Sequence, residues 1–362
     1  ADDQDSDWGL WCHTNFSLVS PEIYGESNPE YFSMIDGKRT LDNSDICLSN
    51  PEVFEIAYNS LKELIEAKPE VSYWSVSQMD NNRYCRCPEC SKANEKAGGP
   101  MGTILPFTNK MARKFPDKII STLSYWYSTK PPKDIVPEKN VNIMLCNIGS
   151  PRHIPIQQGD PNFCKDLEGW NKLTDNILLW DYIVNFSHLI SPFPNLRTLQ
   201  PNLQYLNSNS VVAMFEQGNR EIGGEFCELR AYLLSKLMWN PSIDINEVMN
   251  DFLNGYYGAA GKDIRAYIDL LHDEMERTEA KLSIFGKPSE AMDSFLSQEM
   301  MVRYDEIFDK AELAVANDPE VLFRVQTARV PLNYSKLAIA KEQILGERGA
   351  FFTDTDGSIK PK

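Results

Sequence analysis

The stretch 71-VSYWSVSQMDNNRYCRCPEC-90 decides the fold more than any other part of the chain. Four of its first eight residues are large and apolar, and they fall on both faces of an extended chain, which is typical of a strand buried on both sides of a parallel sheet. Amide and carboxylate side chains follow at once, and then three cysteines in a C-x-C-x-x-C spacing. Polar residues at the carboxyl end of a buried strand are typical of an α/β protein with a site at that edge.

Similar apolar runs recur through the first 258 residues and alternate with helical segments instead of hairpin turns. The predicted strands cover residues 9–14, 71–78, 119–127, 141–148, 176–183 and 211–217. The predicted helices between and after them cover residues 51–69, 104–117, 163–175, 195–209 and 224–241. This alternation predicts a parallel sheet with crossover helices. Aromatic and carboxylate residues at the strand ends favour a (β/α)8 TIM-type barrel, and no G-x-G-x-x-G follows any strand to suggest a dinucleotide-binding sheet.

The character of the sequence changes after residue 258. Long helical periods with charged outer faces occupy residues 262–282, 292–316 and 319–345. We therefore predict a barrel catalytic domain over 1–258, a helical bundle over 259–345 and a tail over 346–362, which we expect to be a loop or the start of a further segment. Six strands are two fewer than a complete barrel needs, so either the first two strands precede this chain or two strands escape the pattern.

Composition and charge exclude several classes of partner. The net charge of −16 argues against nucleic acid, because phosphate binding needs a basic face. No apolar run reaches the length of a membrane-crossing helix. The acidic start, ADDQDSDW, is not a signal peptide, so an exported protein would have its leader outside this chain. Eight cysteines among 362 residues are too few for a disulfide scaffold.

The strand ends carry carboxylates, amides and aromatic rings with few cations. A phosphate ligand would require Lys, Arg or a glycine-rich helix start, whereas sugar hydroxyls suit amides and carboxylates, and sugar faces suit aromatic rings. Glycoside hydrolysis needs two carboxylates, and the candidates are Asp80, Asp181, Glu216 and Glu225. Nucleophilic alternatives are weaker, because no G-x-S-x-G is present and neighbouring Cys12 and His13 would point to opposite faces of a strand.

The cysteine spacing indicates a metal site without defining it. Cys85, Cys87 and Cys90 supply three thiolates, one fewer than a structural zinc usually has. Cys12, His13 or Cys47 could supply the fourth ligand. One disulfide with a free thiol, or thiols packed in a loop, are the alternatives, and no other cofactor is required.

Long motifs in the chain resemble a large bacterial family that is catalogued as a domain of unknown function and associated with glycoside hydrolase family 163. The motifs run from about residue 9 to residue 275 and include WCHTNFSLVSPEIYGESNPEYFSMIDGKR, ICLSNPEV, SVSQMDNNRYCRCPEC, LLWDYIVNFSHLISPFPN, FEQGN and GGEFCELRAYLLSKLMWNP. The resemblance implies a (β/α)8 barrel with two further strands before this chain begins. It also implies an endo-β-N-acetylglucosaminidase that cuts complex N-glycans between the two core GlcNAc residues, with the substrate's own acetamido oxygen as nucleophile.

The resemblance assigns roles to particular residues. Asp80 and Glu216, at the ends of what would be strands four and eight, are the predicted catalytic pair, with their two roles undecided. The resemblance predicts His13, Gln78, Asn81, Asp181, Tyr182 and Asn185 as substrate-binding residues. Tyr125 and Trp180 are predicted to join them because they stand at strand ends. The family's Asn-Asp-Asn after the glutamine is Met79-Asp80-Asn81 here, which changes one polar neighbour of the aspartate.

The expected partner is an oligosaccharide or a glycoprotein glycan, and the expected location is secreted, periplasmic or cell-surface. Two alternatives remain: a non-catalytic carbohydrate-binding barrel, or an exo-acting glycosidase on uronic or other sugars.

Overall fold

The computed structural model describes residues 7–219, 221, 223–346 and 348–362. The chain forms two compact units. The first contains the residues up to Ile148 together with Asn162–Asp181 and Asn209–Phe215. The second contains Gly149–Pro161, Tyr182–Ser208 and Glu216–Lys362. The boundary predicted at residue 258 falls inside the second unit.

A six-stranded sheet runs through the chain and confirms the predicted α/β class. Its strands are β1 (Trp8–Leu10), β4 (Tyr73–Ser75), β5 (Ile119–Ser124), β6 (Val141–Cys146), β7 (Ile177–Tyr182) and β8 (Val211–Gln217). Their order in the sheet is β1-β4-β5-β6-β7-β8, and the four pairs from β1 to β7 are parallel. Every residue of β6 is buried, as expected for a strand covered on both faces. All six strands were expected from the sequence, while closure into an eight-stranded barrel stays a prediction.

Three aromatic rings show that the sheet is curled within the first unit. Trp11, just after β1, lies 5.5 Å from Trp180 of β7 and 5.5 Å from Phe215 of β8, measured between ring centroids. Four strand spacings separate β1 from β7, which in a flat sheet would amount to about 19 Å. The sheet must therefore bend so that strands far apart in its order bring their side chains together, as in a barrel wall.

Helices of the first unit follow amphipathic segments of the sequence. The unit contains α2 (Asn15–Leu18), α3 (Pro21–Tyr24), η1 (Pro29–Tyr31), α4 (Pro51–Ala67), α5 (Pro88–Ala97), α6 (Met101–Lys114) and η2 (Trp126–Ser128), and α8 (Pro161–Asn171) lies almost wholly within it. Asn50 caps α4 by accepting a hydrogen bond from the backbone of Glu52. The buried residues of α4 recur at helical spacing from Val53 to Ile65. Helix α5, which carries Cys90, was not expected from the sequence.

A short hairpin forms over residues 34–39, where the sequence predicts neither a strand nor a helix. Strands β2 (Met34–Ile35) and β3 (Lys38–Arg39) pair antiparallel. The two residues between them, Asp36 and Gly37, have φ angles of 49° and 78°. Two consecutive positive φ angles define the type I′ turn, for which Asp-Gly is a preferred pair. This dipeptide was the local signal for the hairpin.

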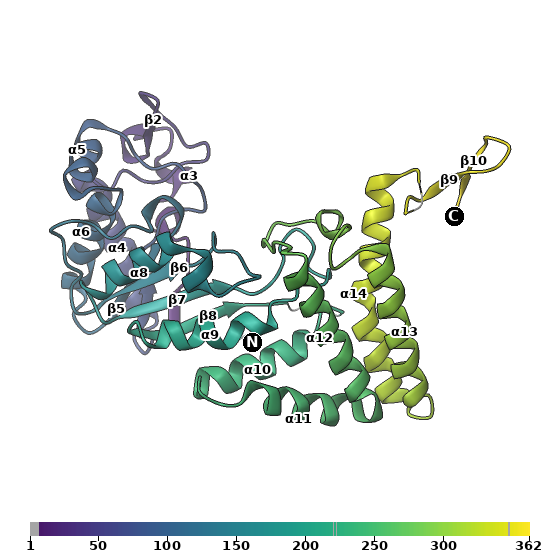
Figure 1. The fold of residues 1–362 in the computed structure, drawn as a ribbon. Coiled ribbons are helices and arrows are strands. Elements are labelled where there is room, and N and C mark those ends of the chain that lie inside the picture. The colour runs from purple at the N-terminus through teal and green to yellow at the C-terminus, as the bar shows by residue number, and fades with distance from the viewer. Residues whose placement is uncertain (1–6, 220, 222, 347) are drawn as a thin grey trace. The chain divides into compact units, whose positions relative to one another are not determined.

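The second unit is mostly helical. It contains α7 (Ile156–Gly159), α9 (Leu196–Asn207), α10 (Cys227–Trp239), α11 (Ile245–Tyr257), η3 (Gly258–Ala260), α12 (Gly261–Arg277), η4 (Pro288–Ala291), α13 (Gln298–Ala314), α14 (Pro319–Gln343), and the antiparallel pair β9 (Phe351–Thr353) and β10 (Ile359–Pro361). Helices α13 and α14 lie side by side (Figure 1). The helices predicted in this unit are confirmed as α9, α10, α12, α13 and α14. Helix α11 was not expected from the sequence. Residues 351–361 form the β9–β10 hairpin where a loop or the start of a further segment was expected. No helix in the described part of the chain is long and apolar enough to cross a membrane.

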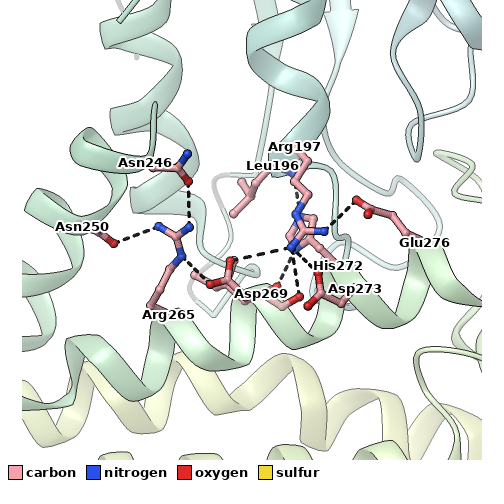
Figure 2. Close-up of polar contacts among 10 residues, drawn as sticks. Leu196, Arg197, Asn246, Asn250, Arg265, Asp269, His272, Asp273 and Glu276 are labelled. Atoms are coloured by element: carbon pink, nitrogen blue, oxygen red, sulfur yellow. Dashed lines mark hydrogen bonds and ion pairs between the residues drawn. The ribbon is translucent and has the colours of Figure 1, made fainter. Parts of the chain in front are cut away.

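Helices α9 and α12 of the second unit are joined by charged and polar contacts (Figure 2). Arg197 of α9 contacts Asp273 at 2.7 Å and Glu276 at 2.9 Å, both on α12. The backbone N–H of Leu196 donates to Nε2 of His272, at 3.1 Å. The first set of contacts is exposed to solvent, and the histidine contact is buried.

Candidate active site

Three of the predicted site residues meet at the carboxyl edge of the sheet in the first unit. His13 follows β1, Asp80 follows β4 and Tyr125 follows β5, and these strands are neighbours in the sheet. The hydroxyl of Tyr125 donates to Oδ1 of Asp80 at 3.1 Å. Nε2 of His13 lies 3.9 Å from the same oxygen. The side chain of Asp80 is 66% exposed, so this carboxylate is held from inside the protein and open to a ligand outside.

Gln78 forms the buried floor of this cluster. Its Nε2 donates to the carbonyl of Tyr125 at 3.1 Å, and its Oε1 accepts from Ser128 Oγ at 2.5 Å. Its backbone carbonyl lies 2.7 Å from Nδ1 of His13, and a carbonyl can only accept, so Nδ1 carries the proton. Nε2 of His13 is thereby the nitrogen that faces Asp80. The amide of Gln78 is turned inward and only 2% of the residue is exposed, so it positions His13 and Tyr125.

The environment of Tyr125 keeps its phenol protonated. Burial and the neighbouring charge of Asp80 raise the pKa of Tyr125 well above its ordinary value. The hydroxyl is therefore a hydrogen-bond donor at any physiological pH. The adjacent Trp126 is 41% exposed and has a φ of 52°, a left-handed conformation that a bulky side chain adopts only under strain. Strained residues cluster at functional sites, and this ring was not among the predicted site residues.

A buried carboxylate that the sequence did not predict supports the loop of Asp80. Oδ2 of Asp45 accepts from the backbone N–H of Met79 at 3.0 Å. Oδ1 accepts from Asn15 Nδ2 and from the backbone N–H of Ile46, each at 2.7 Å. Burial raises the pKa of Asp45 to about 6, against the lowering effect of these hydrogen bonds. Asp45 lies in a loop that follows none of the strands predicted from the sequence, so only its place beside the ICLSNPEV motif marked it.

Asn81 also has a positioning contact in this structure. Its Nδ2 donates to the carbonyl of Ser44 at 2.8 Å, and its Oδ1 accepts from the backbone N–H of Arg83 at 2.7 Å. Asn81 and Asp45 thus bind the loop after β4 to the segment 44–46 at two points. The sugar contacts predicted for Gln78 and Asn81 stay predictions, while their contacts within the protein shape the loop that carries Asp80.

The residues predicted on β7 divide between the two units. Trp180 belongs to the aromatic cluster with Trp11 and Phe215 described above. Asp181 is 3% exposed, and its Oδ1 accepts from Asn147 Nδ2 at 3.0 Å. Both residues lie in the first unit, but Asp181 is buried in β7 beside Asn147, which follows β6.

Tyr182, Asn185 and Glu216 lie in the second unit. Tyr182 is buried, and its carbonyl accepts from Arg152 Nε at 2.6 Å. Asn185 donates to the carbonyl of Gly286 at 2.8 Å and borders a cavity of about 230 Å³. Glu216 is half-buried near the end of β8. The predicted pairing of Glu216 with Asp80, which belongs to the first unit, stays a prediction.

Glu225, the fourth candidate carboxylate, is part of a buried ion pair. Its Oε2 lies 3.3 Å from Nη2 of Arg230 and accepts from the backbone N–H of Phe193 at 2.8 Å. Only 4% of Glu225 is exposed. Burial raises its pKa, and the guanidinium of Arg230 opposes that shift. A carboxylate that is buried in this way and paired with an arginine is suited to stabilising the fold.

The cysteine motif gathers a fourth thiol in the first unit. Cys85, Cys87 and Cys90 are joined by Cys47, all four are buried, and their sulfur atoms lie within 4.8 Å of one another. No other group of this kind occurs in the described ranges, and neither Cys12 nor His13 belongs to it. Cys47, Cys85, Cys87 and Cys90 carry free thiols, so no disulfide occupies the motif. Hydrogen bonds from Cys85 and Cys90 lower the pKa of Cys47, and the bond to Cys47 raises the pKa of Cys85 to about 11.

Comparison with protein families places the chain in one of them. The model of the family described as a domain of unknown function, DUF4838, matches residues 2–269. The chain belongs to the DUF4838 family. The predicted resemblance to a family catalogued as a domain of unknown function is confirmed at this level. No curated protein matches this DUF4838 chain.

Solved structures include one described as a GH138 enzyme targeting pectin rhamnogalacturonan II. It is similar to this DUF4838 chain with a TM-score of 0.38 and 11% sequence identity. The match covers 81% of this chain and 49% of that one, so the chain spans about half the length of that protein. A likeness at this level assigns neither a fold nor an activity.

Proposed function

We propose that this DUF4838 chain is a glycoside hydrolase. The observation that carries the proposal is the exposed carboxylate of Asp80, held by the hydroxyl of Tyr125 at 3.1 Å beside the imidazole of His13. Glycosidases act through carboxylates of fixed orientation that reach the sugar, and this one stands at the carboxyl edge of a curled parallel sheet. The exposed ring of Trp126 next to Tyr125 offers a face on which a sugar can stack.

We propose further that the substrate is a GlcNAc-containing glycan, with complex N-glycans as the target of endo cleavage. This finer part follows from the sequence motifs and from the chemistry of the Asp80–Tyr125 pair. An acetamido group has one N–H donor and one carbonyl acceptor. A carboxylate beside a phenol hydroxyl complements both, because Asp80 can accept the N–H while the hydroxyl of Tyr125 turns from Asp80 to donate to the carbonyl. This match favours Asp80 as the residue that orients the acetamido group, with Glu216 as acid and base.

The proposed reaction has two steps. In the first, the acetamido oxygen bonds to the anomeric carbon while the glycosidic C–O bond breaks, and Glu216 gives its proton to the departing oxygen. In the second, water attacks the anomeric carbon, Glu216 accepts a proton from that water, and the acetamido oxygen leaves. The configuration at the anomeric carbon is retained. In both steps the carboxylate of Asp80 stabilises the positive charge that develops on the acetamido nitrogen.

The test is release of free glycan from a complex-type glycoprotein, followed by mass spectrometry. Asp80→Asn and Glu216→Gln are each expected to lower kcat/KM at least about 100-fold. Tyr125→Phe removes one hydrogen bond to a charged group and is expected to lower kcat/KM about 10- to 100-fold with an unchanged melting temperature. Trp126→Ala is expected to raise KM about 5- to 10-fold with kcat nearly unchanged. Tyr24→Phe, on α3 outside the cluster, is the control and is expected to behave like the wild type.

Other outcomes would decide against this proposal. Full activity in both Asp80→Asn and Tyr125→Phe would exclude the site. Tight oligosaccharide binding without turnover by the wild-type chain would favour the non-catalytic alternative. Release of single terminal sugars would favour the exo-acting alternative.

A further inference from the structure

We infer that Cys47, Cys85, Cys87 and Cys90 bind one zinc ion that braces the loop carrying Asp80. This inference does not depend on the proposed glycosidase activity. It rests on the arrangement of the four sulfur atoms, on the polar groups around them, and on the segments that they connect.

The four sulfur atoms lie within 4.8 Å of one another, and their separations are of the size that a zinc tetrahedron requires. Cys47 Sγ lies 3.5 Å from Cys85 Sγ, 3.7 Å from Cys87 Sγ and 4.0 Å from Cys90 Sγ. Zinc–sulfur bonds of about 2.3 Å in a regular tetrahedron place the sulfur atoms about 3.8 Å apart. A disulfide would require about 2.05 Å, so these distances suit shared coordination of one ion.

Polar groups around the cluster suit thiolates, which carry charge when they bind a metal. The backbone N–H of Met34 donates to Cys85 Sγ at 3.3 Å, and Nη1 of Arg39 donates to the same sulfur at 3.6 Å. Both donors come from the β2–β3 hairpin. The hydroxyl of Ser49 lies 3.1 Å from Cys90 Sγ. Four thiolates around Zn²⁺ leave a net charge of −2, and a guanidinium with N–H donors offsets part of it.

Burial and local structure complete the site. All four cysteines are at most 5% exposed. Cys87 stands immediately before α5 and Cys90 lies in its first turn, so both residues lie at the positive end of a helix, which favours thiolates. Cys47 comes from a separate segment 38 residues before Cys85. A four-sulfur site that is closed to solvent is typical of structural zinc.

The cluster connects two segments that also hold the candidate active site. Cys47 follows Asp45, which binds the backbone N–H of Met79, and Ser44, whose carbonyl binds Asn81. Cys85 lies at the carboxyl end of the loop that contains Met79 and Asn81. A metal that joins Cys47 to Cys85 therefore closes a ring of contacts around residues 79–85, and Asp80 lies within it.

The first experiment measures metal content and coordination in the whole chain purified without chelators. Elemental analysis is expected to find about one zinc per chain, and X-ray absorption at the zinc edge is expected to find four sulfur neighbours at about 2.3 Å. Cys47→Ser is expected to lower zinc below about 0.2 per chain. Cys164→Ser, a cysteine on α8 outside the cluster, is the matched control and is expected to keep its zinc. The absorption spectrum of the wild type tests the site even if Cys47→Ser fails to fold.

The second experiment measures amide hydrogen exchange before and after zinc removal with a mercurial reagent. Residues 79–90 are expected to exchange faster once the metal is lost, while α14 is expected to be unchanged. Iron in place of zinc, four free thiols without metal, a disulfide within the cluster, or full zinc in Cys47→Ser would each overturn the site. Zinc with unchanged exchange at residues 79–90 would overturn its role as a brace.

Discussion

His272, on α12 of the second unit, is held as a neutral imidazole by two backbone groups. Its Nε2 accepts from the N–H of Leu196 at 3.1 Å (Figure 2). Its Nδ1 donates to the carbonyl of Ile268 at 2.8 Å. A proton on Nε2 would face the N–H of Leu196 and break this contact. Burial lowers the pKa of His272 to about 4, from an ordinary value of 6.5.

This environment predicts a pH-dependent contribution to stability. Between about pH 6.5 and 4 the unfolded chain binds a proton at this residue and the folded chain does not. The contribution is therefore complete above about pH 6.5 and is lost as the pH falls toward 4. We expect the difference in unfolding free energy between the wild type and His272→Gln to shrink by about 2 kcal/mol from pH 7.5 to pH 4.5. Urea denaturation at the two pH values measures it, and a difference independent of pH would contradict the assignment.

At the scale of elements, the ion pair Glu225–Arg230 holds the start of α10 to the segment 193–195. Arg230 donates to the carbonyls of Glu225 and Phe193 and to Oδ1 of Asn195. Both charges are almost completely buried, at 3% and 4% exposure of their side chains. Removal of one buried partner leaves the other charge without compensation, which costs far more than loss of an exposed pair.

Arg230→Met is therefore expected to lower the free energy of unfolding by about 3–5 kcal/mol. Together with Glu225→Leu, it is expected to show a coupling energy of at least about 1 kcal/mol in a double-mutant cycle measured by urea denaturation. Arg197→Met is the control, because Arg197 also binds carboxylates but is 39% exposed, and its loss is expected to cost at most about 1 kcal/mol. Equal losses in Arg197→Met and Arg230→Met would show that burial does not set the cost.

Two elements of the first unit were missed because their signals are local and short. The Asp36-Gly37 turn of the β2–β3 hairpin could be recognised from the dipeptide alone. Helix α5 has few apolar residues, and its buried positions include Cys90 and Asn94, so its periodicity does not stand out from a loop. The hairpin supplies hydrogen-bond donors to the thiol cluster, and α5 carries Cys90. The two elements that were hardest to predict from the sequence therefore both form part of this cluster.

At the scale of the whole molecule, the division into two units predicts how the chain tolerates truncation. Helix α12 buries Ile264, Tyr267, Ile268 and Leu271 in the second unit, where it packs against α11 and α13. A chain that ends at residue 258 lacks this helix and leaves α11 and the segment before α9 uncovered. We therefore expect the fragment 1–258 to show no single cooperative thermal transition by circular dichroism.

Truncation after residue 350 is the control for this experiment. It removes only the β9–β10 hairpin, whose strand residues are mostly exposed, and is expected to leave the melting temperature within a few degrees of the wild type. A cooperative transition in the fragment 1–258 would instead support the domain boundary predicted from the sequence.

The sequence by itself determined the six strands, their parallel class and most of the helices between them, because runs buried on both faces and amphipathic periods are local patterns. It also identified His13, Asp80 and Tyr125, since polar residues after neighbouring parallel strands must share one edge of a sheet. Only the tertiary structure decided that Cys47 completes the thiol cluster, that Asp45 holds the backbone of Met79, and that the sheet curls enough to bring Trp11 against Trp180. Each of these features depends on contacts between segments that are distant in the chain. Local residue spacing cannot predict which distant side chain makes such a contact.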